Sequence, residues 1–205
     1  PELEGQIDVE QVKTMVDMFM ERGFTYFDTA YFYHGTKSEC FVREALVSRH
    51  PRDSFYVATK LPAWAGAKDA EAAKQMFFTS LERTGAGYFD FYLLHNLGKE
   101  NYARCLATDA FDFLREVKAR GKANKVGFSF HDSAEVLDQI LTDRPELEFV
   151  QLQFNYADYD DPKVESWGCY QVCEKYNKPA IIMEPVKGGL LINLPDEGKA
   201  VLDEL

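Results

Sequence analysis

The stretch 54–61, SFYVATKL, combines aromatic and β-branched residues and closes with Lys60 and a leucine. That composition is typical of a β-strand. Two further stretches have the same character. The stretch 24–30, FTYFDTA, precedes it, and the stretch 88–94, YFDFYLL, follows it. Strands spaced roughly 30 residues apart leave room for one helix between each pair.

Helical periodicity fills the intervals between these strands. The first helix is expected to begin at Asp8, with Gln11 as its capping-box partner, and to end at Gly23. Strands that alternate with helices pair in parallel, with right-handed crossovers. Further strands are predicted at 125–129, 149–154 and 180–184, and further helices at 38–48, 70–83, 109–120, 165–176, from 199 onward, and over 132–141 with Asp132 as cap.

Six strands in this alternation fit an open doubly wound sheet or most of an eight-stranded barrel. No GxGxxG turn follows the first strand, which weakens the dinucleotide-binding version of the open sheet. A barrel places its active site at the carboxyl ends of its strands, and polar, reactive side chains stand at those positions here: Asp28, Lys60, His95, Ser129 and Gln151. The prediction is therefore an α/β fold of the (β/α)8 TIM-barrel type, forming a single domain over 1–205. Since a full barrel takes about 250 residues, we expect its first and last strands to lie outside this chain.

Charge and composition narrow the classes of partner. The chain has 34 acidic and 23 basic residues, giving a net charge of -11, so no nucleic acid and no anionic membrane is expected as partner. No apolar run approaches the ~20 residues that span a bilayer. Four cysteines are too few for a disulfide framework in a chain of this size. We expect Cys169 and Cys173 to be buried thiols, and we expect no metal site and a cytoplasmic protein.

Four side chains near the strand ends suit one kind of chemistry. Taken singly, each has an ordinary explanation: Asp28 as a turn cap, Lys60 as a solvated lysine, His95 as a core histidine and Tyr33 as a packing tyrosine. If the strands are neighbours, however, their ends lie about 4.8 Å apart, and three ends span roughly 10 Å. Together the four groups could polarise a carbonyl and protonate the alkoxide that forms.

Tyr33 is the expected acid of this group. A phenol with the ordinary pKa of ~10 is a reluctant proton donor at neutral pH, but an adjacent ammonium lowers that pKa. Lys60 is placed to supply the charge, Asp28 to hold the lysine charged, and His95 to hydrogen-bond the carbonyl oxygen. None of the four is a hydride source, so the reaction needs a redox cofactor.

Five motifs, in this order, resemble the aldo/keto reductase family: GFTYFDTAYFYHG, VATKLP, YFDFYLLHN, VGFSFHDS and VQLQFNY. The family's Asp-Tyr-Lys-His tetrad falls on Asp28, Tyr33, Lys60 and His95. The resemblance implies a (β/α)8 barrel and the reversible reduction of small-molecule aldehydes or ketones. It implies NADP or NAD as cofactor, with NADP favoured. It also implies cofactor contacts from Asp28 and, to the nicotinamide carboxamide, from Ser129 and Gln151.

The chain departs from the family pattern at two of these positions. Many reductases have Ser-Asn after the fifth strand, where this chain has Ser129-Phe130, and Asn155 is a candidate substitute for the missing contact. Many also stack a tyrosine on the nicotinamide from the seventh strand, where Met183 or Glu184 stands here. SFHDSAEV, KLPAW and IIMEPVKGGLL resemble a microbial branch that often carries an iron–sulfur segment after the barrel. No CxxCxxC run occurs, so such a cluster is expected only outside the given chain.

Two loop residues are candidates for the substrate pocket. Trp64 follows Lys60 on the next loop, and His34 follows Tyr33; loop packing is the alternative role for each. The alternative function is a nicotinamide-nucleotide-binding regulatory or electron-transfer subunit with little turnover.

Overall fold

The central sheet consists of parallel strands that follow one another in chain order. The computed structural model describes residues 2–3 and 6–203. Over these residues each strand of the sheet pairs in parallel with the next, in the order β3-β4-β5-β6-β7-β8. The strands are β3 (Tyr26–Asp28), β4 (Tyr56–Leu61), β5 (Phe89–Leu94), β6 (Ala123–Phe130), β7 (Val150–Gln153) and β8 (Ala180–Met183).

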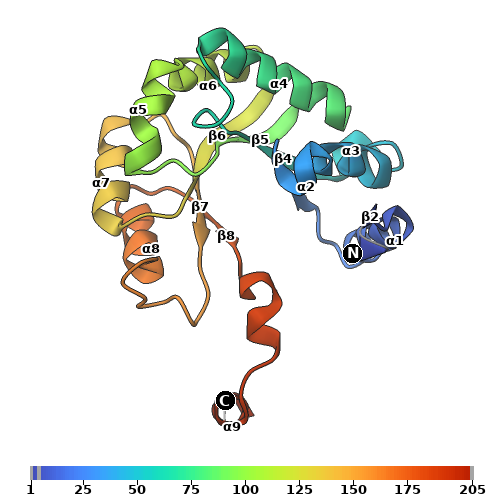
Figure 1. Cartoon of the computed structure of the whole chain (residues 1–205), viewed down its shortest axis with the longest axis vertical. Helices are drawn as coiled ribbons and strands as arrows, with labels where there is room; N and C mark the ends of the chain where they lie inside the picture. Colours follow the sequence, from blue (N-terminus) through green and yellow to red (C-terminus); the bar gives the residue numbers. More distant parts are fainter. Residues whose placement is uncertain (1, 4–5, 204–205) are drawn as a thin grey trace.

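The sheet is curled, and helices lie along its convex side (Figure 1). The predicted α/β barrel fold is thereby confirmed, as a partial barrel whose sheet edges are β3 and β8 within the described residues. The longer helices are α1 (Val9–Glu21), α4 (Ala70–Thr84), α5 (Lys99–Ala107), α6 (Ala110–Ala119), α7 (Ala134–Asp143), α8 (Ser166–Lys175) and α9 (Asp196–Asp203).

Shorter elements occupy the connections. They are the antiparallel pair β1 (Glu2–Leu3) and β2 (Gln6–Ile7), the helices α2 (Tyr33–Thr36) and α3 (Ser38–Val42), a π-helical turn at Arg43–Val47, and 3₁₀ turns at Arg52–Ser54 and Lys187–Ile192. The sequence predicted neither the β1–β2 pair nor α5. In Figure 1 the final helix α9 stands apart from the curled sheet, below β8.

An aromatic cluster holds the helices against the outer side of the sheet. Phe77 of α4 is fully buried, and its ring centroid lies 4.8 Å from that of Tyr92 on β5 and 5.6 Å from that of Phe113 on α6. These rings meet edge to face, the arrangement that aromatic pairs favour. The cluster fixes α4 and α6 over β4–β6, and so fixes the strands whose ends carry the polar residues.

A smaller core fills the inside of the curl. Its buried members are Ala58, Leu93 and Phe149, one from each of three strands or their flanks. Gly127 of β6 makes room for this packing, because a Cβ added there would lie 2.8 Å from ring atoms of Phe149. No side chain larger than hydrogen fits at that approach. Because side chains alternate along a strand, every second residue faces the inside of the curl. The polar residues at the carboxyl ends of the strands therefore face the same side as this small core.

One predicted helix start needs correction. Ser133, rather than Asp132, caps α7, because the Ser133 side chain accepts from the backbone N–H of Val136. Asp132 instead accepts from the N–H groups of Ser133 and Lys99, and thus ties α7 to the start of α5. The first helix begins as predicted, with the Asp8 carboxylate accepting from the Gln11 N–H. Over the described residues, no helix has the length and apolar character needed to cross a membrane.

Candidate active site

Two neighbouring strand ends bring Asp28 and Lys60 together. Asp28 is the last residue of β3 and pairs with Ala58, so Lys60 lies two positions further along β4 on the same face. The Nζ atom of Lys60 lies 2.5 Å from Oδ2 of Asp28 and 2.9 Å from the carbonyl oxygen of Thr29. Lys60 is almost completely buried, whereas the Asp28 side chain keeps 29% of its exposure. The carboxylate therefore faces the opening while the ammonium lies beneath it.

Tyr33 reaches the same point from the turn after β3. Its phenol oxygen lies 3.5 Å from Nζ of Lys60, and its ring centroid lies 4.9 Å from that nitrogen. The turn is tight: His34, Gly35 and Thr36 all have positive φ, at 48°, 61° and 72°. Left-handed backbone costs energy at the two non-glycine positions. This reversal folds the phenol back over the end of the sheet.

His95 closes the group from the end of β5. Its ring centroid lies 5.7 Å from that of Tyr33, with the planes at 80°. Trp64 also packs against the imidazole, with ring centroids 6.1 Å apart, and its indole N–H donates to the carbonyl oxygen of His95 at 2.7 Å. Nδ1 of His95 is buried and has no hydrogen-bond partner among the described residues. The four tetrad positions thus meet, with Trp64 beside them.

The electrostatics differ from the sequence-based expectation. Burial, and after it the nearby carboxylates of Asp28 and Glu184, raise the pKa of Tyr33 to about 12. The pKa of Tyr33 is thus raised rather than lowered, and the acidifying effect of Lys60 stays a prediction. The Lys60 ammonium lies 2.5 Å from the Asp28 carboxylate and 3.5 Å from the phenol oxygen. Burial also lowers the pKa of Lys60 itself, while Asp28 opposes that shift.

His95 is neutral at neutral pH. Burial lowers its pKa to about 4, and the positive charges of Lys60 and of a protonated His131 act in the same direction. A neutral imidazole carries one N–H and one lone pair. At neutral pH His95 can therefore donate one hydrogen bond without adding a charge to the site.

The ends of β6 and β7 add Ser129 and Gln151, which are paired in register and buried. Nε2 of Gln151 donates to Oδ1 of Asp28 at 3.0 Å, so the aspartate is held by both Lys60 and Gln151. Oε1 of Gln151 is buried without a partner among the described residues. The Ser129 hydroxyl accepts from the N–H of Asn96 at 2.8 Å, which leaves its own proton available. The site therefore presents an open acceptor and an open donor on adjacent strands.

Asn155 lies further along the loop after β7, and its amide is engaged within that loop. Its oxygen accepts from the N–H groups of Ala157 and Asp158, each at 3.0 Å. Its nitrogen donates to Asp158 and to the carbonyl oxygen of Glu184. The structure does not bring Asn155 to Asp28 as it brings Gln151. A cofactor contact from Asn155 would have to replace one of these bonds.

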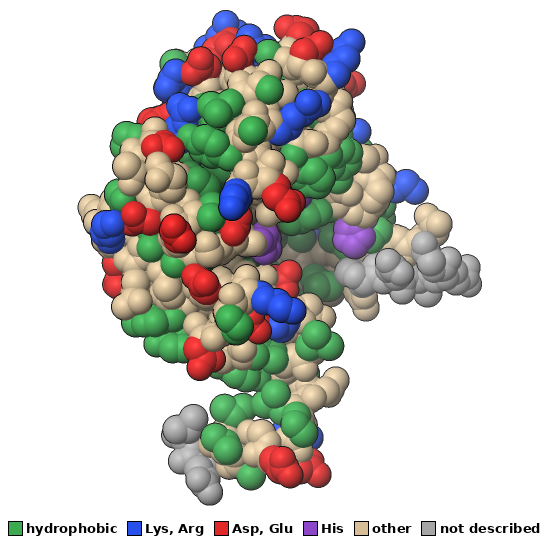
Figure 2. Space-filling model, turned by 60° about the vertical axis from the view of Figure 1, so that its left-hand side comes forward, with side chains coloured by type: hydrophobic (Ala, Val, Ile, Leu, Met, Phe, Trp, Pro, Cys, Tyr) green, Lys and Arg blue, Asp and Glu red, His purple; other side chains and the backbone are tan. Residues whose placement is uncertain are grey.

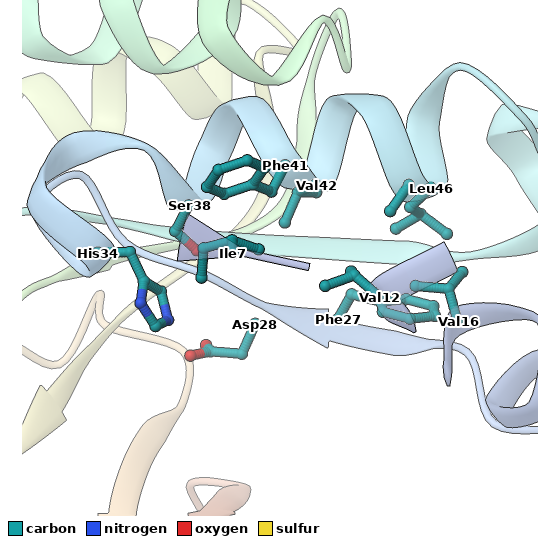
Figure 3. A pocket seen from close by; sticks show the side chains of 11 residues that line it. Ile7, Val12, Val16, Phe27, Asp28, His34, Ser38, Phe41, Val42 and Leu46 are labelled. Carbon is teal, nitrogen blue, oxygen red and sulfur yellow. The ribbon is translucent and has the colours of Figure 1, made fainter. Parts of the chain in front are cut away.

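His34 lies on the β3 side of the site. Figure 3 shows its imidazole near the Asp28 carboxylate at one end of a mainly apolar cavity of about 200 Å³. The other lining residues are Ile7, Val12, Val16, Phe27, Ser38, Phe41, Val42, Ala45 and Leu46. Trp64 and His34 thus flank the tetrad from different directions: Trp64 against His95, and His34 beside Asp28. Figure 2 shows a recess in the surface with histidine side chains at its rim.

Sequence reasoning gave no role to Gln153 and Asp158, which orient a further histidine. Nδ1 of His131 lies 3.3 Å from Oε1 of Gln153, and Nε2 of Gln153 donates to Oδ2 of Asp158 at 2.7 Å. Asp158 is fully buried and also pairs with Lys187. One signal was present in the sequence, since Gln153 lies two residues after Gln151 and therefore on the same face of β7. Among the described residues, no group of three His, Cys, Asp or Glu side chains forms a metal site.

Comparison with known proteins identifies the family. The model of the aldo/keto reductase family matches residues 2–204, so the chain belongs to that family. An aldo-keto reductase of Mycolicibacterium smegmatis is 32% identical over 140 residues, which are 67% of this chain and 46% of the relative. A second one from the same organism is 29% identical, over 60% of this chain and 42% of its own length. The chain thus spans less than half the length of these relatives.

Two solved structures share the fold. An aldo-keto reductase from Klebsiella pneumoniae in complex with NADPH superposes with a TM-score of 0.70 at 23% identity, over 89% of this chain and 61% of that one. An aldo-keto reductase from Bacillus halodurans in its holo form gives a TM-score of 0.68 at 24% identity, over 93% of this chain and 62% of that one. The parallel, curled sheet is therefore the family's barrel, present here in part.

Proposed function

We propose that this chain carries the catalytic tetrad of an NAD(P)H-dependent oxidoreductase that reduces aldehydes or ketones to alcohols. The observation that supports the proposal most is the meeting of Asp28, Tyr33, Lys60 and His95 at the carboxyl ends of three adjacent strands. A structural ion pair would explain Asp28 and Lys60 alone. It would not explain a phenol and a neutral imidazole facing the same pair.

Each residue has a role set by its protonation state. His95 is neutral and donates a hydrogen bond to the carbonyl oxygen, which polarises the carbonyl. Tyr33 is protonated at neutral pH and donates its proton to the oxygen when that oxygen becomes an alkoxide. An alkoxide is a far stronger base than a phenolate, so this transfer is downhill even for a phenol of raised pKa. Lys60 then stabilises the phenolate until a proton from water restores it.

A reduced nicotinamide, when bound, supplies the hydride that the carbonyl carbon accepts. The residues at the ends of β6 and β7 fit its carboxamide. The unpartnered Oε1 of Gln151 would accept from the amide N–H, and the Ser129 hydroxyl would donate to the amide oxygen. Asp28 borders the same space through its bond with Gln151. NADP is favoured over NAD by the family resemblance, and Asn155 remains a candidate for a further contact.

The substrate is proposed to be a small carbonyl compound that enters between Trp64 and His34, which border the tetrad. The net charge of -11 supports a small-molecule substrate rather than nucleic acid. A single domain and a cytoplasmic location remain predictions from the sequence.

The test is turnover by the full-length protein. It is mixed with NADPH and a panel of aldehydes and ketones, and oxidation of the nicotinamide is followed by absorbance. We expect turnover with at least one carbonyl compound. Binding of NADPH without its oxidation across the panel would contradict the proposal. That result would favour the alternative, a nucleotide-binding regulatory or electron-transfer subunit.

A further inference from the structure

We infer that the buried Glu39 and the half-buried Arg83 form a clamp that positions the Tyr33 phenol over Lys60, so that Glu39 and Arg83 are positioning residues of the proposed reaction. The inference rests on the proposed function for its catalytic consequence. Its structural part, that the clamp fixes the loop before Tyr33, stands independently of that function. Neither residue touches the proposed reacting atoms.

Tyr33 has little support of its own. Its side chain keeps 39% of its exposure, and its phenol oxygen has one polar contact among the described residues, the 3.5 Å approach to Lys60. The next three residues have positive φ, so the turn that follows Tyr33 is strained. A half-exposed ring on a strained turn keeps its place only if the preceding residues are anchored from behind.

Glu39 provides that anchor from α3. It is completely buried, and its Oε1 accepts from the hydroxyl of Thr59 at 2.7 Å. Thr59 is also fully buried and directly precedes Lys60 on β4, so its side chain points to the opposite side of the sheet. The Glu39 carboxylate therefore holds Thr59, and with it the backbone next to Lys60, in place. A completely buried carboxylate needs a charged partner, because its desolvation costs several kcal/mol.

Arg83, near the end of α4, is that partner and links Glu39 to the Tyr33 loop. Its Nη1 lies 3.4 Å from Oε2 of Glu39 and donates to the carbonyl oxygen of Tyr31 at 3.3 Å. The guanidinium also lies over the Tyr31 ring, 4.4 Å from its centroid, in cation–π geometry. One arginine therefore holds both the backbone and the ring of a residue two positions before Tyr33.

A second set of contacts holds the same loop at Thr29, two residues before Tyr31. The hydroxyls of Thr29 and Ser38 lie 2.9 Å apart, and the Thr29 carbonyl oxygen accepts from Lys60. The loop from Asp28 to Tyr33 is thus fixed at Thr29 and at Tyr31. Thr29 is bonded to Lys60 directly, and Tyr31 is linked to β4 through Arg83 and Glu39. Loss of the Arg83 contacts would free Tyr31 and allow the phenol to move away from the ammonium.

The experiment compares Arg83→Gln with Arg83→Lys and a matched control in the full-length protein. The control is Lys74→Gln, which removes another α4 cation that pairs with Glu116 at 3.5 Å, away from the loop. We expect Arg83→Gln to lower kcat by about 100-fold, the cost of a misplacement of about 1 Å. We expect the KM values for the carbonyl substrate and for NADPH to change less than about threefold, because neither the substrate nor the cofactor is expected to contact Arg83. Arg83→Lys should recover part of kcat, and Lys74→Gln should keep all of it.

A double variant separates positioning from stability. Replacing a buried ion pair by apolar residues often leaves stability unchanged or raised, so Glu39→Met with Arg83→Met should fold with a urea midpoint near that of the unmodified protein. Its kcat should stay as low as that of Arg83→Gln. An unmodified kcat in this double variant would overturn the inference.

Hydrogen exchange provides a readout that does not need turnover. The amides of residues 31–34 should exchange faster in Arg83→Gln than in the unmodified protein, with α6 amides unchanged. Unaltered exchange at 31–34 would overturn the clamp even if kcat fell. If the unmodified protein shows no turnover with any carbonyl, the proposed function fails, whereas faster exchange would still support the clamp.

Discussion

The Nζ atom of Lys60 lies 2.5 Å from Oδ2 of Asp28, a full ångström closer than it lies to the phenol oxygen of Tyr33. The ammonium is therefore primarily the partner of the carboxylate. The pKa of Tyr33 is raised to about 12 despite the adjacent lysine. Burial is the largest cause of that shift, and the negative charges of Asp28 and Glu184 add to it.

Removing the carboxylate should reverse part of that shift. In Asp28→Asn we expect the pKa of Tyr33 to fall below about 12, because the Asp28 charge is the second cause of its increase after burial. The phenolate is measured by ultraviolet absorbance against pH, with a Tyr33→Phe spectrum subtracted. Glu184→Gln is the graded control and should lower the pKa less, since Glu184 contributes less than Asp28. A titration of Asp28→Asn that matches the unmodified protein would refute this electrostatic account.

Removing the phenol oxygen should abolish most of the proposed reaction. Tyr33→Phe keeps the ring that packs near His95 but has no proton to donate, and loss of a general acid typically costs 10²–10⁴-fold, so we expect kcat to fall by roughly 10³-fold. NADPH affinity, measured by fluorescence titration, should be unchanged. Tyr56→Phe, which alters an exposed tyrosine at the start of β4, is the matched control. Equal turnover in Tyr33→Phe and the unmodified protein would remove Tyr33 from the acid role.

The strands and most helices could be predicted because their signals are local. Aromatic and β-branched runs mark β4 and β5, and the alternation of strands and helices implies parallel pairing. Neighbouring strand ends then bring Asp28, Lys60 and His95 together. Helix α5 was missed because Lys, Glu, Asn and Arg interrupt its sequence, KENYARCLA, and it has one fully buried residue, Cys105. The β1–β2 pair has two residues in each strand, too few for any pattern.

The electrostatics and the supports of the site could not be predicted in the same way. The pKa of Tyr33 depends on burial and on the carboxylates near the phenol, and both are set by how the chain packs around the ring. Glu39 and Arg83 meet although 44 residues separate them in the chain. No periodicity links them, because one lies on α3 and the other on α4. Their contact follows only from how the two helices pack on the sheet.

The lowered pKa of His95 makes stability depend on pH. The pKa of His95 is about 4 when folded and about 6.5 in an unfolded chain. Between these values the unfolded state binds the proton and the folded state does not, so stability falls as the pH falls from about 6.5 to about 4. We expect the urea midpoint of the unmodified protein to drop between pH 7 and pH 5. His95→Asn cannot take up that proton, so its midpoint should drop less. An equal drop in both proteins would contradict the assignment.

A series of paired side chains links Lys187 to His131 through Asp158 and Gln153. These contacts should determine which nitrogen of His131 carries the proton. Asp158, paired with Lys187, is an acceptor only, so Gln153 must turn its N–H₂ toward it and its oxygen toward His131. Gln153 Oε1 can then only accept, which places the His131 proton on Nδ1 and leaves a lone pair on Nε2. Burial lowers the pKa of His131, which favours this neutral form.

Nitrogen NMR of selectively labelled protein at pH 7.5 distinguishes the two tautomers of His131 directly. We expect a protonated Nδ1 and an unprotonated Nε2 in the unmodified protein. In Asp158→Asn the new amide can accept or donate, so Gln153 is no longer held in one orientation and both tautomers should appear. Lys163→Gln, which alters a lysine elsewhere on the same loop, should leave the spectrum unchanged. A proton on Nε2 in the unmodified protein would contradict this assignment. Gln153 would then have to present its N–H₂ to His131 and its oxygen to the buried carboxylate of Asp158.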